Sequence, residues 1–463
     1  MFSVSKLFAA LGIAHERRTQ MNGDLKRLAV ISGMRTPFCK AGTDYSNVHA
    51  ADLGVAAVTA AIQKAGLTPA DIDEVVLGNV SGPADAANIA RIVAMQAGLP
   101  QDRIAHTVNR NCASGMESVL SAWQILQTGR ASTIVAGGTE SMSAIPLLFG
   151  PEATRLFTEL SRAKTLGARL KVFARFRPGH FKPVPGVLLG LTDPFCGLNM
   201  GQTAEKLAQE FSISREDQDR FALESHRAAS AAQERCFLSG EISAMKDVKS
   251  LKTPLSGGDI APSIRELSQD NGPRHHQTFE ALKKLRPIFR KDGTVTAGNS
   301  CPLTDGGAAV VLTSSEFANR QGLRPLGYVT GSAIVGCDPS RMGLGPVYAT
   351  ARLLKQTGLT LADFDLVEIN EAFAAQVLAC LAAFESDAFA GKELNLSKAL
   401  GTVPREKLNV NGGAIALGHP VGTTGTRMLI TLLRALREKG LHRGLATLCV
   451  GGGQGVAMMV EVS

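Results

Sequence analysis

The chain has 463 residues, and division by about 150 residues per domain predicts roughly three domains. Its 44% hydrophobic and 19% charged residues exclude an intrinsically disordered chain, and eight scattered cysteines without a Cys-x-x-Cys pair exclude a zinc ribbon and a small disulfide scaffold. No apolar run approaches the roughly 18 residues of a membrane span, and free thiols indicate a reducing compartment.

The first residues of the chain show no pattern that predicts a helix or strand of the folded domain. Residues 7–14 are apolar and two arginines follow, but we find no small-residue cleavage site of a secretory signal. We expect residues 1–26 to form a flexible leader, with a mitochondrial presequence as the alternative.

Residues 27–147 alternate strand and helix patterns and form the first predicted half. LAVISGMR reads as a strand entering a loop, and TIVAGG reads as a second, buried strand. We expect residues 293–321, with the run GGAAVVLTS, to return to the same sheet.

Residues 148–292 lack this alternation, and we expect a mostly helical inserted domain. Ser214 is a predicted helix N-cap, with Glu216 and Asp217 in the first turn. Residues 151–186 carry eight Lys and Arg against two Glu, a net charge of +6 within the chain's +8. One basic segment in an otherwise balanced chain argues against nucleic acid and for a local anionic partner, either phosphates or a membrane surface.

Residues 322–463 form the second predicted half, ending in a helix and two strands joined by a Gly-rich turn. GLTPADIDEVV at 66–76 and GLTLADFDLVE at 358–368 share seven of eleven positions without a gap. We infer two homologous α/β halves.

Cys112 is the first candidate for chemistry, because a predicted helix begins directly after it. Unpaired N–H groups and the helix dipole favour a thiolate at such a position, although a lone cysteine is more often inert. We therefore expect the Cys112 thiolate to be enriched near neutral pH.

His419 lies in the glycine-rich run NGGAIALGHPVGTTG, where the backbone approaches a ligand closely and Pro420 restricts the chain. The position suits a general base; a histidine bonded only to local backbone is the alternative. A nucleotide-phosphate loop is disfavoured because no Walker lysine follows.

Two further candidates end predicted strands of the second half. Cys449 precedes three glycines whose N–H groups suit oxyanion chemistry. Asn370, at the end of another strand, is either a helix N-cap or a polar group aimed into a cleft.

Together these segments resemble the thiolase superfamily from about residue 27 to 461. The resemblance rests on NRNC at 109–112, GGTESMS at 137–143, NMGQTAE at 199–205, NEAFA at 370–374, NGGAIALGHPVGTTG at 411–425 and CVGGGQG at 449–455. It implies a duplicated, five-layered α/β/α/β/α core with an inserted helical loop domain over a CoA site.

The resemblance also implies roles. Cys112 would be the acylated nucleophile, His419 its activating base, and Cys449 the acid and base at the acetyl carbon. Asn370, through a water, and His419 would form one oxyanion hole, and the backbone N–H groups of Cys112 and Gly451 the other. Met200, Ser300 and Cys301 would contact CoA, which enters as substrate, and neither a metal nor a bound cofactor is implied.

The implied activity is that of a 3-ketoacyl-CoA thiolase in fatty-acid β-oxidation, an acyltransferase. An acetoacetyl-CoA thiolase working in the condensing direction is the alternative. A carrier-protein ketosynthase lacks a cysteine at the position of Cys449, and a non-catalytic lipid-binding or scaffold relative would be expected to lose Cys112 or His419.

Segments 151–186 and 385–406 resemble thiolase subunits of fatty-acid-oxidation complexes, although those relatives usually carry His where this chain has Asn370. We therefore expect acyl-CoA and CoA as ligands, a homodimer or dimer of dimers, a hydratase/dehydrogenase subunit as a candidate partner, and no nucleic acid. Residues 155–176 mix apolar and basic side chains. This predicts either a basic face packed on the loop domain or an interfacial helix that docks on an anionic membrane or a partner subunit. The expected compartment is the cytoplasm, with the mitochondrial matrix as the alternative.

Overall fold

The computed structural model describes residues 27–246 and 266–463, so the predicted leader 1–26 lies outside the described residues. Its centre is a mixed sheet with the strand order β10-β11-β12-β9-β1-β8-β5-β3-β4, and short β2 pairs with β8. The strands are β1 (Leu28–Arg35), β2 (Cys39–Lys40), β3 (Glu74–Gly78), β4 (Ile104–Val108), β5 (Thr133–Glu140), β8 (Thr304–Ser314), β9 (Gly327–Gly336), β10 (Leu366–Ile369), β11 (Arg443–Val450) and β12 (Gln454–Glu461).

The sheet consists of two parts that meet where β1 and β9 pair over three residues, Leu28 to Val30 against Val329 to Gly327. The part formed by β1, β8, β5, β3 and β4 takes β8 from the segment that follows the inserted domain. The second part is formed by β10, β11, β12 and β9.

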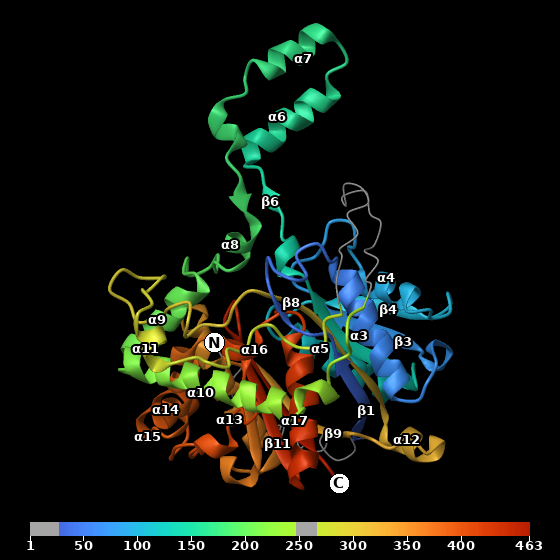
Figure 1. The fold of residues 1–463 in the computed structure, drawn as a ribbon, viewed down its shortest axis with the longest axis vertical. Helices are drawn as coiled ribbons and strands as arrows, with labels where there is room; N and C mark the ends of the chain where they lie inside the picture. The colour runs from blue at the N-terminus through green and yellow to red at the C-terminus, as the bar shows by residue number, and fades with distance from the viewer. Residues whose placement is uncertain (1–26, 247–265) are drawn as a thin grey trace, which may run out of the picture.

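Helices cover both outer faces and fill the space between the two parts of the sheet (Figure 1). Alternate residues of each strand pack on different helices, which produces three apolar cores. The outer helices of the first half are α3 (Ala50–Lys64) and α4 (Ile89–Gln96), the central ones α5 (Ser114–Gln127) and α17 (Thr424–Lys439), and the outer ones of the second half α13 (Gly345–Thr357) and α14 (Ala374–Phe384). The predicted five-layered α/β/α/β/α core is confirmed.

The internal repeat has the same local structure in both halves. Thr68 and Thr360 each begin a short 3-10 turn, and each backbone N–H donates to the carboxylate three residues on, Asp71 or Asp363, at 2.7 Å. The strands that follow, β3 and β10, each have a parallel neighbour, β5 and β11 respectively. The same capping box therefore precedes an equivalent strand in each half.

The inserted segment is mostly helical where the structure describes it. Its longer helices on the body are α9 (Met200–Glu210) and α10 (Arg215–Glu234), and a short α11 (Phe279–Lys283) follows. Ser214 caps α10 through a capping box with Asp217, as predicted.

A helical hairpin stands away from the body on a narrow stalk (Figure 1). It consists of α6 (Pro151–Arg162) and α7 (Leu166–Phe173), and the stalk contains β6 (Leu147–Leu148) paired with β7 (Val184–Pro185), followed by α8 (Gly186–Gly190). The expectation of a basic face packed on the loop domain is therefore wrong. The single helix expected over 155–176 is also wrong, since Ala163 adopts an extended backbone and ends α6.

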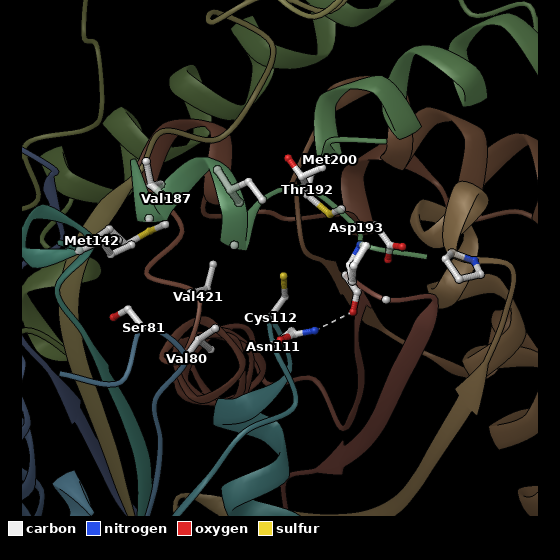
Figure 2. Close-up of a pocket in the computed structure, with 18 of the residues that line it drawn as sticks. Val80, Ser81, Asn111, Cys112, Met142, Val187, Thr192, Asp193, Met200 and Val421 are labelled. Carbon is white, nitrogen blue, oxygen red and sulfur yellow. Dashed lines mark hydrogen bonds between the residues drawn. The ribbon is translucent and has the colours of Figure 1, made fainter. Parts of the chain in front are cut away.

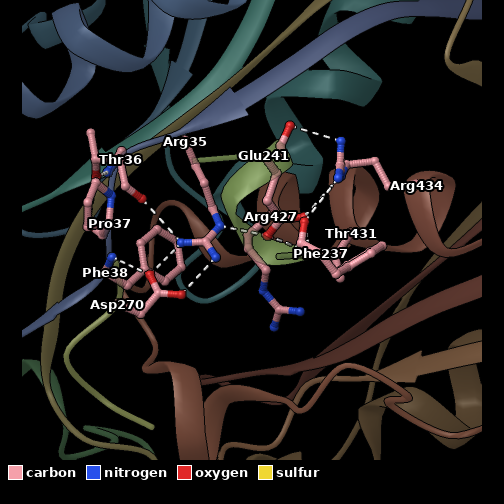
Figure 3. Close-up of polar contacts among 12 residues, drawn as sticks. Arg35, Thr36, Pro37, Phe38, Phe237, Glu241, Asp270, Arg427, Thr431 and Arg434 are labelled. Carbon is pink, nitrogen blue, oxygen red and sulfur yellow. Dashed lines mark hydrogen bonds and ion pairs between the residues drawn. The ribbon is translucent and has the colours of Figure 1, made fainter. Parts of the chain in front are cut away.

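A buried ion pair fastens the inserted segment to the core (Figure 3). The Arg35 guanidinium, on β1, binds Glu241 at 2.7 Å and both oxygens of Asp270 at 2.6 and 2.8 Å. The Thr431 hydroxyl, on α17, donates to Glu241 at 3.0 Å. Because Glu241 and Asp270 belong to the inserted segment, these contacts join it to the first strand and to the central helix.

No helix in residues 27–246 and 266–463 is long and apolar enough to cross a membrane.

Candidate active site

Cys112 lies just before α5 and lines a cavity of about 830 Å³, in agreement with its predicted place at a helix N-terminus. The preceding Asn111 adopts a left-handed conformation (φ 45°), and its side chain donates to the carbonyl of Gly451 at 2.8 Å. This bond joins the turn before Cys112, in the first half, to the glycine turn after β11 in the second half (Figure 2).

The expected thiolate is wrong for the free protein. Burial raises the pKa of Cys112 above its ordinary value of 9.0, and the N–H groups of Gly451 and of Cys112 itself only partly offset this. Cys112 therefore rests as a thiol and needs a base. These two N–H groups near the sulfur belong to the two residues that the sequence predicts as oxyanion donors.

His419 is buried and held as a neutral imidazole with one free nitrogen. Its Nδ1 lies 2.6 Å from the Thr424 hydroxyl oxygen, and that hydroxyl donates its hydrogen to the carbonyl of Pro420 at 3.1 Å. The Thr424 oxygen is thus left to accept from Nδ1–H, which leaves Nε2 unprotonated. Within the described residues Nε2 has no hydrogen-bond partner.

Burial, assisted by the positive charge of Arg427, lowers the pKa of His419 to about 3. The ring is therefore uncharged at neutral pH, and its free Nε2 can accept a proton. The alternative of a histidine bonded only to local backbone is not what the structure shows, because Nδ1 binds a side chain and Nε2 is free.

The loop that carries His419 is clamped against β5. A Cβ added at Gly138 would lie 1.9 Å from the carbonyl oxygen of Gly422, so only glycine permits this approach. The buried Glu140 carboxylate accepts from the N–H of Gly422 at 2.9 Å and from the N–H groups of Val80 and Ser81 at 3.0 Å. Glu140 therefore holds the His419 loop and a wall of the cavity in one arrangement.

Asn370 directly follows β10, Cys449 lies on its parallel neighbour β11, and both residues are 1% exposed. Neither side-chain polar atom of Asn370 has a partner among the described residues. The N-cap alternative for Asn370 is wrong, since α14 begins at Ala374 with Phe373 as its N-cap.

Cys449 is held as a thiol. Burial, followed by the neighbouring thiols of Cys112, Cys380 and Cys301, raises the pKa of Cys449 well above 9.0. A protonated thiol in a dry environment can donate a proton to carbon.

The three predicted CoA contacts lie in different settings. Met200 begins α9 and lines the cavity. Ser300 does not line it, and its hydroxyl donates to the carbonyl of Thr296 at 2.7 Å. Cys301 is also absent from the lining, and burial together with Cys112 raises the pKa of Cys301 to about 12.

Sequence reasoning missed Thr424 and Glu140. Both stand inside motifs already singled out, and both are polar residues within apolar or glycine-rich runs. A polar residue that is certain to be buried needs a partner, and that signal could have marked them as supports of the site.

Comparison with known proteins agrees with this geometry. Residues 28–316 match the family model "Thiolase, N-terminal domain", and residues 323–462 match "Thiolase, C-terminal domain". Curated relatives named 3-ketoacyl-CoA thiolase, from Yersinia enterocolitica and Photorhabdus laumondii, are each 40% identical over 438 residues, which is 94% of this chain and 97% of theirs.

Solved structures are similar over the whole fold. The acetyl-CoA acetyltransferase of Bacillus anthracis superposes with a TM-score of 0.79 at 36% identity, covering 94% of this chain and 98% of that one. Human mitochondrial 3-ketoacyl-CoA thiolase in complex with CoA superposes with a TM-score of 0.78 at 35% identity, covering 95% and 98%. The two matched domains, the relatives and the geometry around Cys112 together show that the chain belongs to the thiolase family.

Proposed function

We propose that the protein cleaves 3-ketoacyl-CoA with a second CoA, giving acetyl-CoA and an acyl-CoA shortened by two carbons. The observation that carries the proposal is the Cys112 thiol, which lines the cavity with the N–H groups of Gly451 and of Cys112 itself near its sulfur. The buried neutral His419 and the buried, protonated Cys449, which lies near Cys112, support it. The names of the curated relatives support the same reaction.

In the first half-reaction, Nε2 of His419 takes the Cys112 proton and the sulfur attacks the 3-keto carbon. The N–H groups of Cys112 and Gly451 hold the resulting oxyanion. The tetrahedral intermediate collapses, the C2–C3 bond breaks, and the acyl group stays on Cys112. The departing enolate oxygen is held by protonated His419 and, through a water, by Asn370, while Cys449 donates its proton to C2.

In the second half-reaction, the Cys449 thiolate takes the thiol proton of the incoming CoA. The CoA sulfur attacks the acyl-Cys112 thioester, and its oxyanion uses the same two N–H groups. Cys112 leaves as a thiolate and regains its proton from His419. Each group ends in its starting state, so the cycle needs no further reactant.

Trapping the acyl-enzyme tests this assignment. A 3-ketoacyl-CoA added without free CoA should leave an acyl group on the Cys112 peptide, detected by mass spectrometry, and Cys112→Ser should abolish both the adduct and thiolysis. Cys236→Ser, which removes an exposed thiol, is the matched control and should turn over normally. An acyl group on any other cysteine would contradict the role of Cys112.

We further propose that the α6–α7 hairpin docks on an anionic membrane surface. Leu166, Leu170 and Phe173 are exposed on α7, and basic side chains lie along the same hairpin. Apolar residues flanked by Lys and Arg are typical of interfacial helices. The proposal also includes a homodimer or dimer of dimers, a hydratase/dehydrogenase partner subunit, and, because the curated relatives are bacterial, a cytoplasmic location.

Co-sedimentation tests the membrane contact, with vesicles that mix a neutral lipid and the anionic lipid phosphatidylserine. Binding at low salt should be lost at high salt and in the variant Arg169→Glu/Lys171→Glu/Arg175→Glu. The matched control, Lys283→Glu/Lys284→Glu/Lys291→Glu, reverses three exposed charges on the body. If the hairpin variant and the body variant bound the vesicles equally well, the hairpin would not be the membrane-binding segment.

A further inference from the structure

Glu371 directly follows Asn370, and no step of the proposed reaction uses it. Its side chain is buried, with 1% exposed, and its carboxyl oxygens accept hydrogen bonds from three other segments of the chain. The Asn409 amide donates at 2.8 Å, the Ser225 hydroxyl at 2.6 Å, and the backbone N–H of Ile415 at 3.1 Å. Because a buried polar group that loses its partner costs free energy, this carboxyl group holds the segments that supply its donors in one arrangement.

The Asn409 side chain fixes the strand end that carries Asn370. Its Oδ1 accepts from the N–H of Ile369 and its Nδ2 donates to the carbonyl of Ile369, both at 2.9 Å, while the same Nδ2 donates to Glu371. One amide group therefore binds the residues before and after Asn370. The Asn370 N–H donates to the carbonyl of Thr447 on β11 at 3.0 Å. Since the Asn370 side chain has no hydrogen-bond partner among the described residues, its position depends on this backbone.

Glu371 also contacts the segment that leads to His419. Ile415, whose N–H it accepts, lies four residues before His419. A Cβ added at Gly413 would lie 2.2 Å from the carboxyl carbon of Glu371, so the carboxyl group packs directly on the backbone of this segment. The Gly413 N–H donates at 3.2 Å to the Ser225 hydroxyl, which itself donates to Glu371. Helix α10 of the inserted segment thus takes part in the same set of contacts.

We propose that Glu371 is a positioning residue that fixes Asn370 and His419 relative to each other. This inference rests on the proposed function, in which these two side chains together hold the enolate oxygen. The donors of such a hole must be set in advance, because groups that reorient during the reaction stabilise the transition state less. The hydrogen bonds described for Glu371 reach neither Cys112 nor Gly451, whose N–H groups form the other proposed hole.

Glu371→Gln tests this role, because glutamine keeps the shape of the side chain but cannot accept from all three donors. An amide nitrogen in the place of Oε1 would meet the Nδ2 of Asn409, and one in the place of Oε2 would meet the N–H of Ile415. Reversing the Asn409 amide does not help, since its Oδ1 accepts from the N–H of Ile369. The variant therefore loses at least one link in every arrangement.

Two reactions that share one acyl-enzyme separate positioning from folding. Thiolysis of 3-ketooctanoyl-CoA passes through the enolate and leaves a hexanoyl group on Cys112. Exchange of the hexanoyl group between hexanoyl-CoA and isotopically labelled CoA uses the same thioester but forms no enolate. In Glu371→Gln, kcat for thiolysis should fall by about 10- to 100-fold and the exchange rate by less than about threefold, with the KM for CoA unchanged.

Glu74→Gln is the matched control, since Glu74 is 2% exposed, begins β3, the strand equivalent to β10, and accepts from Arg130 at 2.9 Å. Ser225→Ala serves if Glu371→Gln does not fold, and it should lower the ratio of thiolysis to exchange in the same direction. Its own control is Ser230→Ala, on the same helix, because the buried Ser230 hydroxyl has no hydrogen-bond partner among the described residues. Both controls should keep the ratio of the unmodified protein.

The results distinguish the role of Glu371 from the reaction itself. An equal loss of both rates in Glu371→Gln, or in Ser225→Ala where the glutamine variant does not fold, would overturn the positioning role and leave the thiolase reaction standing. No loss of either rate would overturn it as well. Failure of the unmodified protein to cleave both 3-ketooctanoyl-CoA and acetoacetyl-CoA would instead contradict the proposed function.

Discussion

Thr424 determines which nitrogen of His419 carries the proton. The hydroxyl of Thr424 donates to the carbonyl of Pro420, so its oxygen accepts from Nδ1–H of the ring at 2.6 Å. Both residues belong to the segment between α16 (Ala414–Leu417) and the first turn of α17, and both are buried. The first turn of α17 therefore holds His419 in the tautomer whose Nε2 can accept a proton, as the proposed role of a base requires.

Thr424→Val should lower kcat by about 10- to 100-fold with little change in KM for CoA. Valine keeps the shape but removes the acceptor, so the proton can move to Nε2 and block the base. Steady-state kinetics will measure the effect, and Thr424→Ser, which restores the hydroxyl, should recover most activity. If Thr424→Ser lost as much activity as Thr424→Val, the effect would come from packing and not from the hydrogen bond to His419.

Cys449→Ala should separate acylation from proton transfer at carbon. Cys112 should still be acylated slowly from an acyl-CoA, but thiolysis and condensation should fall by about 10²- to 10⁴-fold. The physical reason is that the change removes the thiol that is proposed to protonate C2 and that burial keeps protonated. Mass spectrometry and turnover measured on one preparation will check both parts, and near-normal turnover would contradict the two-thiol mechanism.

His226 should make the fold sensitive to acid. It is buried on α10, its Nδ1 accepts from the N–H of Arg274 at 3.3 Å, and burial followed by the Arg274 charge lowers the pKa of His226 to about 4. An unfolded histidine titrates near about 6.5. Between these values the unfolded chain binds the extra proton, so stability is full above about pH 6.5 and is lost as pH falls toward about 4.

His226→Asn should flatten this decline, because the Asn amide oxygen can accept the same hydrogen bond and does not titrate. The slope difference should approach about 1 kcal/mol per pH unit at most, seen as a smaller fall in melting temperature between pH 7 and pH 4.5. His419 contributes in the same direction and is unchanged in this variant. The exposed His276→Asn should keep the original slope; equal slopes in the two variants would exclude the His226 effect.

Asp270→Ala should lower the free energy of unfolding by about 3–5 kcal/mol, because it leaves the fully buried Arg35 guanidinium with one carboxylate instead of two. It also removes the acceptor of the Phe38 N–H, which donates to Asp270 at 2.7 Å. Denaturant unfolding will measure the loss. Removing an exposed pair with Glu216→Ala should cost less than about 1 kcal/mol, and a similar loss in both variants would contradict the buried pair's importance.

The chain order of elements could be predicted well from the sequence. Apolar runs located β1, β5 and β8, the capping residue Ser214 located α10, and the repeat at 66–76 and 358–368 indicated two equivalent halves. These features depend on short-range sterics, capping and periodicity, which a sequence states directly. The family motifs also named Cys112, His419, Asn370 and Cys449 as site residues, and the roles of these residues stay predictions, as do the boundaries drawn for the inserted domain.

The charge states of the site could not be predicted in the same way. A helix N-terminus favours a thiolate at Cys112, but burial outweighs it and raises the pKa of that thiol. Ser300 has the right residue type for a ligand contact, yet its hydroxyl is bonded to Thr296. Desolvation and hydrogen-bond partners depend on which distant segments pack nearby, and local patterns do not contain that information.

The sequence by itself determined the α/β layers, the two halves and the reactive residue types, because those follow from the periodicity of apolar side chains and from short motifs. Only the tertiary structure decided that 155–176 forms two helices on a projecting stalk, and that this stalk walls the cavity at Cys112. The stalk and Cys112 line the same cavity although they lie tens of residues apart, and Gly451, which accepts from Asn111, lines it from more than 300 residues further on. Such contacts arise from the packing of the whole chain, which no local pattern specifies.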